Sequence, residues 1–239
     1  MDIQHLIEFD QQLLLKWNGS DSLLWDGFMW VATSTYIWTP VAIALLYVIF
    51  RNNKLKETLL ILGMLAIVVT LADQISSGIC KPFFARFRPT QDPDLMYMID
   101  IVNGYRGGRY GFTSSHAANT FAVAVFVSLL IKSWPLSITM ILWAALNAYS
   151  RIYLGVHYPG DILFGTLTGV GVGVLVYFLY YYLKEKFLSR PQYISNQYTS
   201  SGYLTSDISI LLTVMAITVL VILINSLAEF RIVVICCVI

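Results

Sequence analysis

The sequence predicts an all-α membrane protein, a polytopic bundle of six transmembrane helices that forms one domain over residues 1–239. Charged side chains make up only 12% of the 239 residues, against roughly 25% in an ordinary soluble domain. Hydrophobic residues make up 57%, and the mean hydropathy is +0.69. Together with several long uncharged stretches, these values exclude a soluble or disordered chain and put the membrane class first.

Six uncharged or nearly uncharged runs are long enough to cross a bilayer core, which takes about 20 residues. They cover residues 27–50, 58–80, 111–131, 133–150, 162–183 and 208–228. The second run carries one acid, Asp73, near its far end. Backbone groups in lipid must bond to one another, so each run is expected to be a helix.

The segment before the first span has the pattern of an amphipathic helix, with polar residues between apolar ones at helical spacing. The apolar positions are Ile3, Leu6, Ile7, Leu13, Leu14 and Trp17. We expect a helix that lies in the membrane interface, although a helix packed on the bundle would give the same pattern. The segment has no cationic start followed by a short apolar core, so we expect no cleaved signal peptide.

The distribution of lysine and arginine predicts the orientation, because cytoplasmic loops are enriched in both. Basic residues follow the first, third and fifth spans: Arg51, Lys54, Lys56, Lys132, Lys184, Lys186 and Arg190. These connections should face the cytoplasm, which puts loop 81–116 and turn 151–161 on the extracytoplasmic side of what we expect to be a bacterial inner membrane. Five basic residues on that side need another explanation: Lys81, Arg86, Arg88, Arg106 and Arg109.

Charge and cysteine content exclude two further kinds of function. Fifteen basic and fourteen acidic side chains leave a net charge of +1, so no overall field exists to hold nucleic acid. Cys80, Cys236 and Cys237 form neither a disulfide framework nor the paired spacing of a zinc site. Any anion binding must therefore be local.

The first of three candidate site segments is KPFFARFRP, residues 81–89. Lys81 and Arg88 are seven residues apart, about two helical turns, so both cations could share one helix face. Pro89 should hold Arg88 in an extended or turn conformation, where its planar guanidinium can bind phosphate oxygens in a bidentate manner. A basic cluster that only contacts lipid headgroups would look much the same.

The second segment is GFTSSHA, residues 111–117, where the polar loop meets the third span. Thr113, Ser114 or Ser115 is expected to cap the helix. The free backbone amides and the positive end of the helix dipole would then form an anion site, with His116 in the first turn. A helix cap beside an incidental histidine is the alternative.

The third segment is SRIYLGVHYPGD, residues 150–161, which begins with Ser150 and Arg151 at the end of the fourth span. Pro159 belongs at a helix start. This leaves His157 just outside the helix and puts Asp161 in its first turn, so that the carboxylate can reach the imidazole and fix its tautomer. A purely structural pair is the alternative, but two of the three histidines fall in these segments on one predicted face, which favours a shared site.

The three segments together carry what phosphoryl transfer needs: cations for the nonbridging oxygens, a helix-terminus anion site, a nucleophile and a general acid. Lys81, Arg88 and Arg151 supply about the charge that bound metal ions would provide, so we expect no metal and no other cofactor. Three carboxylates in the polar loop could bind a cation in principle, but such groups are usually just solvated. They are Asp92, Asp94 and Asp100.

The sequence resembles the type 2 phosphatidic acid phosphatase superfamily of membrane lipid phosphatases, whose catalytic core is shared with vanadium haloperoxidases. Three signatures of that superfamily appear in order between residues 81 and 161. K-x6-R-P matches Lys81, Arg88 and Pro89; P-S-G-H aligns with Thr113, Ser114, Ser115 and His116; S-R-x5-H-x3-D matches Ser150, Arg151, His157 and Asp161. As a set, these signatures are highly specific.

The resemblance implies a role for each matched residue. His157 would be the nucleophile that forms a phosphohistidine, Asp161 would orient it, and His116 would protonate the leaving group and later activate water. The phosphate would be held by Lys81, Arg88, Ser114, Ser115 and Arg151. Thr113 and Ser115 replace the proline and glycine of the second signature, although a serine at 115 can still donate its backbone N–H.

Asp73 lies eight residues before Lys81, a little more than two helical turns. It could pair with Lys81 behind the site. A polar residue at the interfacial end of a helix is the alternative, and we leave Asp73 out of the predicted site.

We therefore expect a metal-independent lipid phosphatase that hydrolyses a phosphomonoester or diphosphate of a lipid on the extracytoplasmic face. The family implies undecaprenyl diphosphate, phosphatidylglycerol phosphate, phosphatidic acid or lipid A as substrate, and the sequence does not choose among them. A phosphotransferase that passes the phosphoryl group to another lipid or sugar would use the same residues. A transporter or noncatalytic scaffold is disfavoured, because transporters place ionisable groups deep in their spans. The expected partners are membrane lipids and no nucleic acid; the sequence does not define the oligomeric state.

Overall fold

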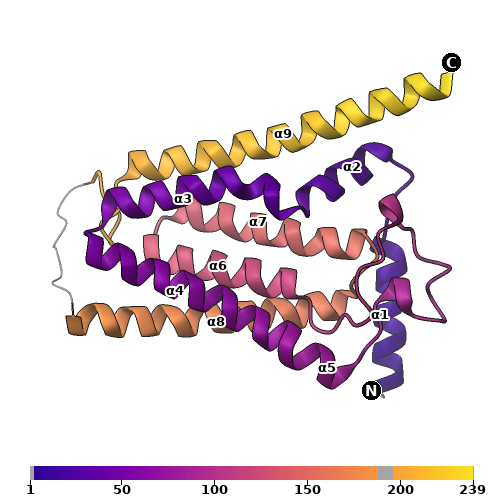
Figure 1. Ribbon diagram of the computed structural model, residues 1–239, viewed down its shortest axis with the longest axis horizontal. Coiled ribbons are helices and arrows are strands. Elements are labelled where there is room, and N and C mark those ends of the chain that lie inside the picture. Colours follow the sequence, from indigo (N-terminus) through magenta and orange to yellow (C-terminus); the bar gives the residue numbers. More distant parts are fainter. Residues whose placement is uncertain (1–2, 188–195, 239) are drawn as a thin grey trace.

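Helices make up the regular structure of the protein (Figure 1). The computed structural model describes residues 3–187 and 196–238. Within these ranges no strand forms, and extended backbone pairs only at two isolated bridges, Phe87 with Tyr110 and Tyr198 with Leu204. The predicted all-α class is confirmed for the described residues.

The long helices lie side by side and build the bundle (Figure 1). They are α2 (Leu23–Ala32), α3 (Thr39–Asn52), α4 (Leu55–Asp73), α6 (Ser115–Ile131), α7 (Trp134–Tyr153), α8 (Pro159–Phe187) and α9 (Thr205–Val238). Helix α6 is central, because it packs against α4, α7 and α8, while α9 packs against α2 and α3. Val68, Phe126, Met140 and Val176 are among the buried side chains that join these helices in one apolar cluster.

Three helical stretches in the described part of the chain are long and apolar enough to cross a membrane: Leu55–Phe84, Pro159–Phe187 and Thr205–Leu227. The pair Leu23–Ala32 and Thr35–Asn52 adds a fourth if it is counted as one broken span. Helix α6 is apolar but shorter, and α7 is not among the stretches that qualify. The apolar helices indicate a membrane protein, and the count of six spans stays a prediction.

The run 27–50, which the sequence predicts to be one helix, is broken in the structure. Helix α2 ends at Ala32, the 3-10 helix η1 (Thr35–Trp38) follows, and the two halves of the run are bent by 66°. The Trp38 indole Nε1 donates to the carbonyl oxygen of Ala32 at 2.9 Å, which satisfies one carbonyl at the break. A continuous helix is disfavoured here because Pro40, in the first turn of α3, has no N–H to donate.

Helix α1 (Ile3–Trp17) lies across one end of the bundle (Figure 1). Leu14 on this helix is fully buried, and the helix contacts α7 and α8. Ile3, Leu6 and Phe9 are exposed. The predicted N-terminal helix is therefore present and packs on the bundle, and its placement in the membrane interface stays a prediction.

The chain between α4 and α6 folds into short helices at the α1 end. These are the π-helical η2 (Gln74–Cys80), α5 (Lys81–Phe84), η3 (Pro89–Gln91) and η4 (Val102–Gly104). Ala85 takes a left-handed conformation, with φ of 46°, directly after α5. This turn ends the helix and sends the following loop over the end of the bundle.

Three glycines of α8, spaced four residues apart, let this helix touch the backbone of α6. Small residues at this spacing let membrane helices approach closely. A Cβ at Gly165 would lie 2.6 Å from the carbonyl oxygen of Ser114, and one at Gly173 would lie 2.7 Å from that of Ala122. A Cβ at Gly169 would overlap the carbonyl oxygen of Ala118. The two backbones meet only because these positions carry no side chain, and this close approach fixes the start of α6 against the start of α8.

Gly169→Ala should destabilise the protein, because its Cβ would push α8 away from α6. Overpacking of this kind costs about 1–3 kcal/mol, so the thermal midpoint of the detergent-solubilised protein should fall. Gly171→Ala is the matched control, since it changes the same helix where a Cβ meets nothing within 4 Å. The control should melt at or above the wild-type temperature, because alanine is the better helix former. Equal midpoints for the two variants would contradict the close approach.

Candidate active site

The three predicted segments converge at the α1 end of the bundle (Figure 1). Lys81 begins α5, Ser115 begins α6, Arg151 lies in the last turn of α7, and Asp161 lies in the first turn of α8. His157 comes just before α8, as the position of Pro159 predicts. Both histidines of the predicted site therefore lie at the same end of the molecule.

His157 is held between a carboxylate and a guanidinium. Its Nδ1 lies 3.3 Å from Asp161 Oδ2, and its Nε2 lies 3.2 Å from Arg88 Nη1. Arginine can only donate hydrogen bonds, so Nε2 is the acceptor and the ring proton sits on Nδ1, where Asp161 accepts it. This tautomer leaves the lone pair of Nε2 on the side of the predicted phosphate site.

The His157 ring is 1% exposed and uncharged at neutral pH. Burial and, after it, three nearby cations hold the pKa of His157 well below its ordinary value of 6.5. In order of decreasing effect, these cations are Arg88, Arg151 and Lys81. A neutral imidazole is the form that can act as a nucleophile.

Arg88 has the extended backbone that Pro89 predicts, with φ of −70° and ψ of 153°. Its side chain is buried, and besides His157 it donates to the carbonyl oxygens of Tyr110 and Val156, each at 3.2 Å. The expectation that Lys81 and Arg88 share one helix face is wrong, because α5 ends at Phe84 and the chain turns at Ala85. Both cations nevertheless reach the same site from different elements.

Lys81 reaches the start of α6 from the end of the π-helical segment. Its Nζ donates to Ser115 Oγ at 3.1 Å and to Ser77 Oγ at 3.0 Å. Ser77 Oγ in turn donates to Asp73 Oδ1 at 3.2 Å. Asp73 is thus linked to Lys81 through a serine rather than paired with it directly.

The start of α6 is capped by Ser114, one of the three predicted caps. Ser114 is fully buried, and its Oγ accepts from the backbone N–H of Ala117 at 3.4 Å. Its own backbone N–H donates to the carbonyl oxygen of Asp161 at 3.1 Å. Ser115 and His116 follow in the first turn, where backbone N–H groups have no acceptor within the helix and can bind an anion.

Arg151 is buried and bonded only to neutral groups. Its Nη1 donates to Thr33 Oγ1 at 2.8 Å, and its Nη2 donates to the Tyr105 hydroxyl at 3.2 Å. Its Nε is buried and has no hydrogen-bond partner among the described residues. No carboxylate neutralises this guanidinium in the contacts of the described residues, so its charge is available to an anion.

A cavity of about 730 Å³ opens beside His116 and Arg151. Trp30, Thr33, Tyr36 and Tyr105 are among the residues that line it, and most of its exposed wall is apolar. The break between α2 and α3 forms one side. The cavity can hold the part of a substrate that lies next to its phosphate group.

Arg86 also lies in this site, although no sequence pattern assigns it a role. Its Nη1 donates to Asp161 Oδ1 at 3.0 Å, and its Nη2 donates to Asp10 Oδ2 at 2.8 Å. The signal available in the sequence was the excess of basic residues on the extracytoplasmic side. No local spacing connects Arg86 to Asp10, which lies 76 positions earlier.

Of the three loop aspartates, Asp92 binds structural partners through its carboxylate. Asp92 Oδ2 accepts from the Tyr158 hydroxyl at 2.8 Å, and Asp92 Oδ1 accepts from the backbone N–H of Asp94 at 3.1 Å. Asp100 donates its backbone N–H to Asn18 Oδ1 at 2.7 Å. Among the residues that the structure describes, no three side chains of histidine, cysteine, aspartate or glutamate are grouped as they would be around a metal ion.

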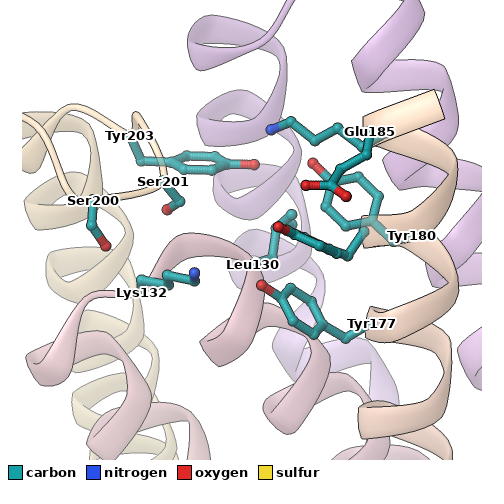
Figure 2. Close-up of a pocket in the computed structure, with 10 residues that line it drawn as sticks. Leu130, Lys132, Tyr177, Tyr180, Glu185, Ser200, Ser201 and Tyr203 are labelled. Atoms are coloured by element: carbon teal, nitrogen blue, oxygen red, sulfur yellow. The ribbon is translucent and has the colours of Figure 1, made fainter. Parts of the chain in front are cut away.

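A second cavity, of about 260 Å³, lies at the opposite end of the bundle (Figure 2). Tyr177 and Tyr180 of α8 line it together with Lys132, at the end of α6, and Tyr203, before α9. The Tyr180 hydroxyl donates to Glu57 Oε1 at 2.9 Å, and Lys184 pairs with the same carboxylate. Since no histidine lines it, this cavity offers no counterpart to the site around His157.

Comparison with known proteins gives consistent matches. A sequence model described as the PAP2 superfamily matches residues 57–185. A protein named lipid A 4′-phosphatase from Bacteroides thetaiotaomicron is 41% identical over 80% of this chain and 83% of its own length. A protein of the same name from Porphyromonas gingivalis is 38% identical over 84% of this chain and 86% of its own length. The crystal structure of Aquifex aeolicus LpxE matches with a TM-score of 0.55 and 24% sequence identity. The match covers 69% of this chain and 92% of the LpxE chain, and it shows a similarity of fold.

The low pKa of His157 predicts that the protein loses stability in acid. The unfolded chain binds a proton at this residue below pH 6.5, whereas the folded chain does not, so stability is full above pH 6.5 and falls as the pH drops. At pH 5.5 only the unfolded chain gains this proton, so the folded state is less favoured than at pH 7.5. Between pH 7.5 and 5.5, the thermal midpoint should therefore fall further for the wild type than for His157→Gln. Equal falls would contradict a buried neutral imidazole.

Proposed function

This chain belongs to the PAP2 superfamily and is a membrane lipid phosphatase, and we propose that it hydrolyses the 4′-phosphate of lipid A or of a closely similar glycolipid through a phosphohistidine at His157. The observation that carries the mechanism is the position of His157 Nε2, which accepts from Arg88 at 3.2 Å while Asp161 holds Nδ1. The nucleophilic atom therefore already contacts a group that binds phosphate.

In the first step, the phosphate ester displaces the contact between Arg88 and Nε2. The lone pair of His157 Nε2 attacks phosphorus, and the bond from phosphorus to the ester oxygen breaks. His116, in the first turn of α6, takes up a proton when the anionic phosphate binds beside it and gives this proton to the leaving oxygen, which departs as an alcohol. Asp161 orients the ring and stabilises the positive charge that the imidazole acquires.

In the second step, His116 takes a proton from water, and the resulting oxygen attacks phosphorus. The bond between phosphorus and Nε2 breaks, its electron pair returns to His157, and inorganic phosphate is released. Throughout both steps, Lys81, Arg88 and Arg151 balance the charge of the phosphate oxygens. We propose that these three cations, with the first-turn amides and side chains of Ser114 and Ser115, are sufficient and that no metal takes part.

The cavity beside Arg151 and His116 supports a substrate whose phosphate is attached to a sugar. Trp30, Tyr36 and Tyr105 give it aromatic walls, and aromatic rings combine apolar faces with polar edges. Such walls suit the flat, partly apolar face of a pyranose ring. Two relatives that are called lipid A 4′-phosphatase and match along most of this chain favour lipid A over the other lipid phosphates of the family.

We also propose that the site faces the extracytoplasmic side of a bacterial inner membrane. The catalytic residues lie at the α1 end of the bundle. Lys132 and Lys184 lie at the other end, near the cavity of Figure 2. This separation agrees with the orientation that the basic connections predict.

His157→Ala should reduce phosphate release from lipid A by more than about a thousandfold, because the variant lacks the nucleophile. The assay uses purified protein in detergent with a metal chelator, and lipid A is compared with undecaprenyl diphosphate, phosphatidylglycerol phosphate and phosphatidic acid. The product mass should show loss of the 4′-phosphate. Wild-type protein should also carry an acid-labile phosphoryl label that the variant lacks.

The matched control is His5→Ala, because His5 is an exposed histidine on α1. It should keep wild-type activity. Equal phosphate release by His157→Ala and wild type would overturn the assignment of His157 as the nucleophile. Loss of activity with the chelator would overturn the proposal that no metal takes part. Faster phosphate release from another lipid of the panel would overturn the proposal that lipid A is the substrate.

Tyr36→Ala should raise KM for lipid A about 2- to 10-fold, since an aromatic contact is worth roughly 0.5–1.5 kcal/mol. Tyr36 lines the cavity and is 88% exposed, so its loss should leave folding intact. The KM for a short-chain phosphatidic acid, which has no sugar, should stay unchanged. Tyr97→Ala is the control, because Tyr97 is equally exposed at 86% and is not among the cavity's lining residues. An equal rise for both substrates would contradict a sugar subsite.

A further inference from the structure

We propose that Arg86 and Asp10 form a positioning pair, in which Arg86 bridges Asp10 of α1 and Asp161 of α8 and thereby holds the carboxylate that orients His157. This inference rests on the proposed role of His157 as nucleophile. It assigns a function in catalysis to the N-terminal helix, which lies outside the three signature segments.

The bridge consists of two short bonds from one guanidinium. Arg86 Nη1 lies 3.0 Å from Asp161 Oδ1, and Arg86 Nη2 lies 2.8 Å from Asp10 Oδ2. The side chain of Asp161 is fully buried, and that of Asp10 is 15% exposed. The planar fork of arginine suits such a bridge, because its donors have a fixed mutual geometry.

The contacts of Asp161 explain why the bridge matters for His157. Asp161 Oδ2 receives the bond from His157 Nδ1 and a second from the backbone N–H of Tyr158 at 3.1 Å. Its other oxygen, Oδ1, is bonded within the described residues by Arg86 alone. Removing that donor would free the carboxylate to rotate about its side-chain bond, and the imidazole would lose its fixed direction.

Asp10 connects this arrangement to the turn that carries the nucleophile. While its Oδ2 binds Arg86, its Oδ1 accepts from the backbone N–H of Gly160 at 2.7 Å. A Cβ at Gly160 would lie 2.7 Å from Asp10 Oδ2, so a larger residue here would require the Asp10 carboxylate to shift. One aspartate of α1 therefore fixes both Arg86 and the first turn of α8.

Arg86 is also held on its flat face. Its Cζ lies 3.8 Å from the centre of the Tyr158 ring, whose hydroxyl is bonded to Asp92. Burial alone would lower the pKa of Arg86, but the Asp161 carboxylate and the bond to Asp10 outweigh it and raise this pKa above its ordinary value. Arg86 is thus a permanent cation whose hydrogen bonds among the described residues go to carboxylates. This separates it from Arg88 and Arg151, which bind neutral groups and remain available to phosphate.

The test is steady-state kinetics of the purified full-length protein with lipid A in detergent. Arg86→Gln should lower kcat about 10- to 100-fold, the range found when the partner that orients a functional residue is lost. KM should stay near the wild-type value, because Arg86 does not contact the phosphate. Arg86→Lys, which keeps the charge, should recover part of kcat. Arg109→Gln is the matched control: Arg109 is an exposed arginine of the same loop that stacks on Phe87.

Asp10→Asn provides a second test, which stays valid even if Arg86→Gln fails to fold. The amide oxygen of the new side chain can still accept from the backbone N–H of Gly160, but the negative charge that binds Arg86 is gone. We therefore expect kcat to fall several-fold with KM unchanged. In an Asp161→Asn background, Arg86→Gln should cause no further loss, because positioning acts through Asp161.

The outcomes separate this inference from the proposed function. Wild-type kcat in both Arg86→Gln and Asp10→Asn would overturn the positioning pair. The positioning pair would also be overturned if Arg86→Gln lowered kcat equally in the wild-type and Asp161→Asn backgrounds, or if it raised KM at constant kcat. His157→Ala is included in the same assay, and full activity of that variant would overturn the proposed function instead.

Discussion

The site depends on the direction in which one buried imidazole holds its lone pair. His157 is fixed at one nitrogen by Asp161 and at the other by Arg88. That geometry requires α8 to begin very close to α6, and the Ser114 backbone N–H donates to the Asp161 carbonyl oxygen across this contact. Gly165 permits the approach, since a Cβ there would clash with the Ser114 carbonyl. A packing feature of two apolar helices is therefore part of the geometry of the proposed catalytic site.

The cations around His157 fall into two groups that differ in their partners. Lys81 and Arg151 bind hydroxyl groups, and Arg88 binds carbonyl oxygens and the imidazole. Neutral acceptors satisfy their donors without cancelling their charge, so an anion entering the site meets three cations to which no carboxylate is directly bonded among the described residues. Arg86 is instead bound to two carboxylates. The same residue type can thus stay open to an anion, as we propose for Arg88 and Arg151, or hold the framework, according to what it faces.

The sequence predicts the parts of this site that are set by local rules. Ser114 caps α6, Arg88 is extended before a proline, and Asp161 reaches His157 because four residues separate them at a helix start. Local rules could not find Arg86 with Asp10, whose contact joins segments that only tertiary folding brings together. The predicted helix face shared by Lys81 and Arg88 fails for a different reason, because a left-handed residue at Ala85 ends α5 and redirects the chain.

The break between α2 and α3 shows why a hydropathy pattern is an incomplete guide to a membrane enzyme. An uncharged run of the right length predicts a continuous helix, but irregular backbone at membrane depth is tolerated where it lines a cavity. Thr33 lies at the break and accepts from Arg151. Inside a continuous helix, a threonine hydroxyl commonly bonds to its own backbone instead. Ending α2 at Ala32 therefore both opens the cavity beside His116 and supplies a neutral partner for Arg151, which we propose to bind phosphate.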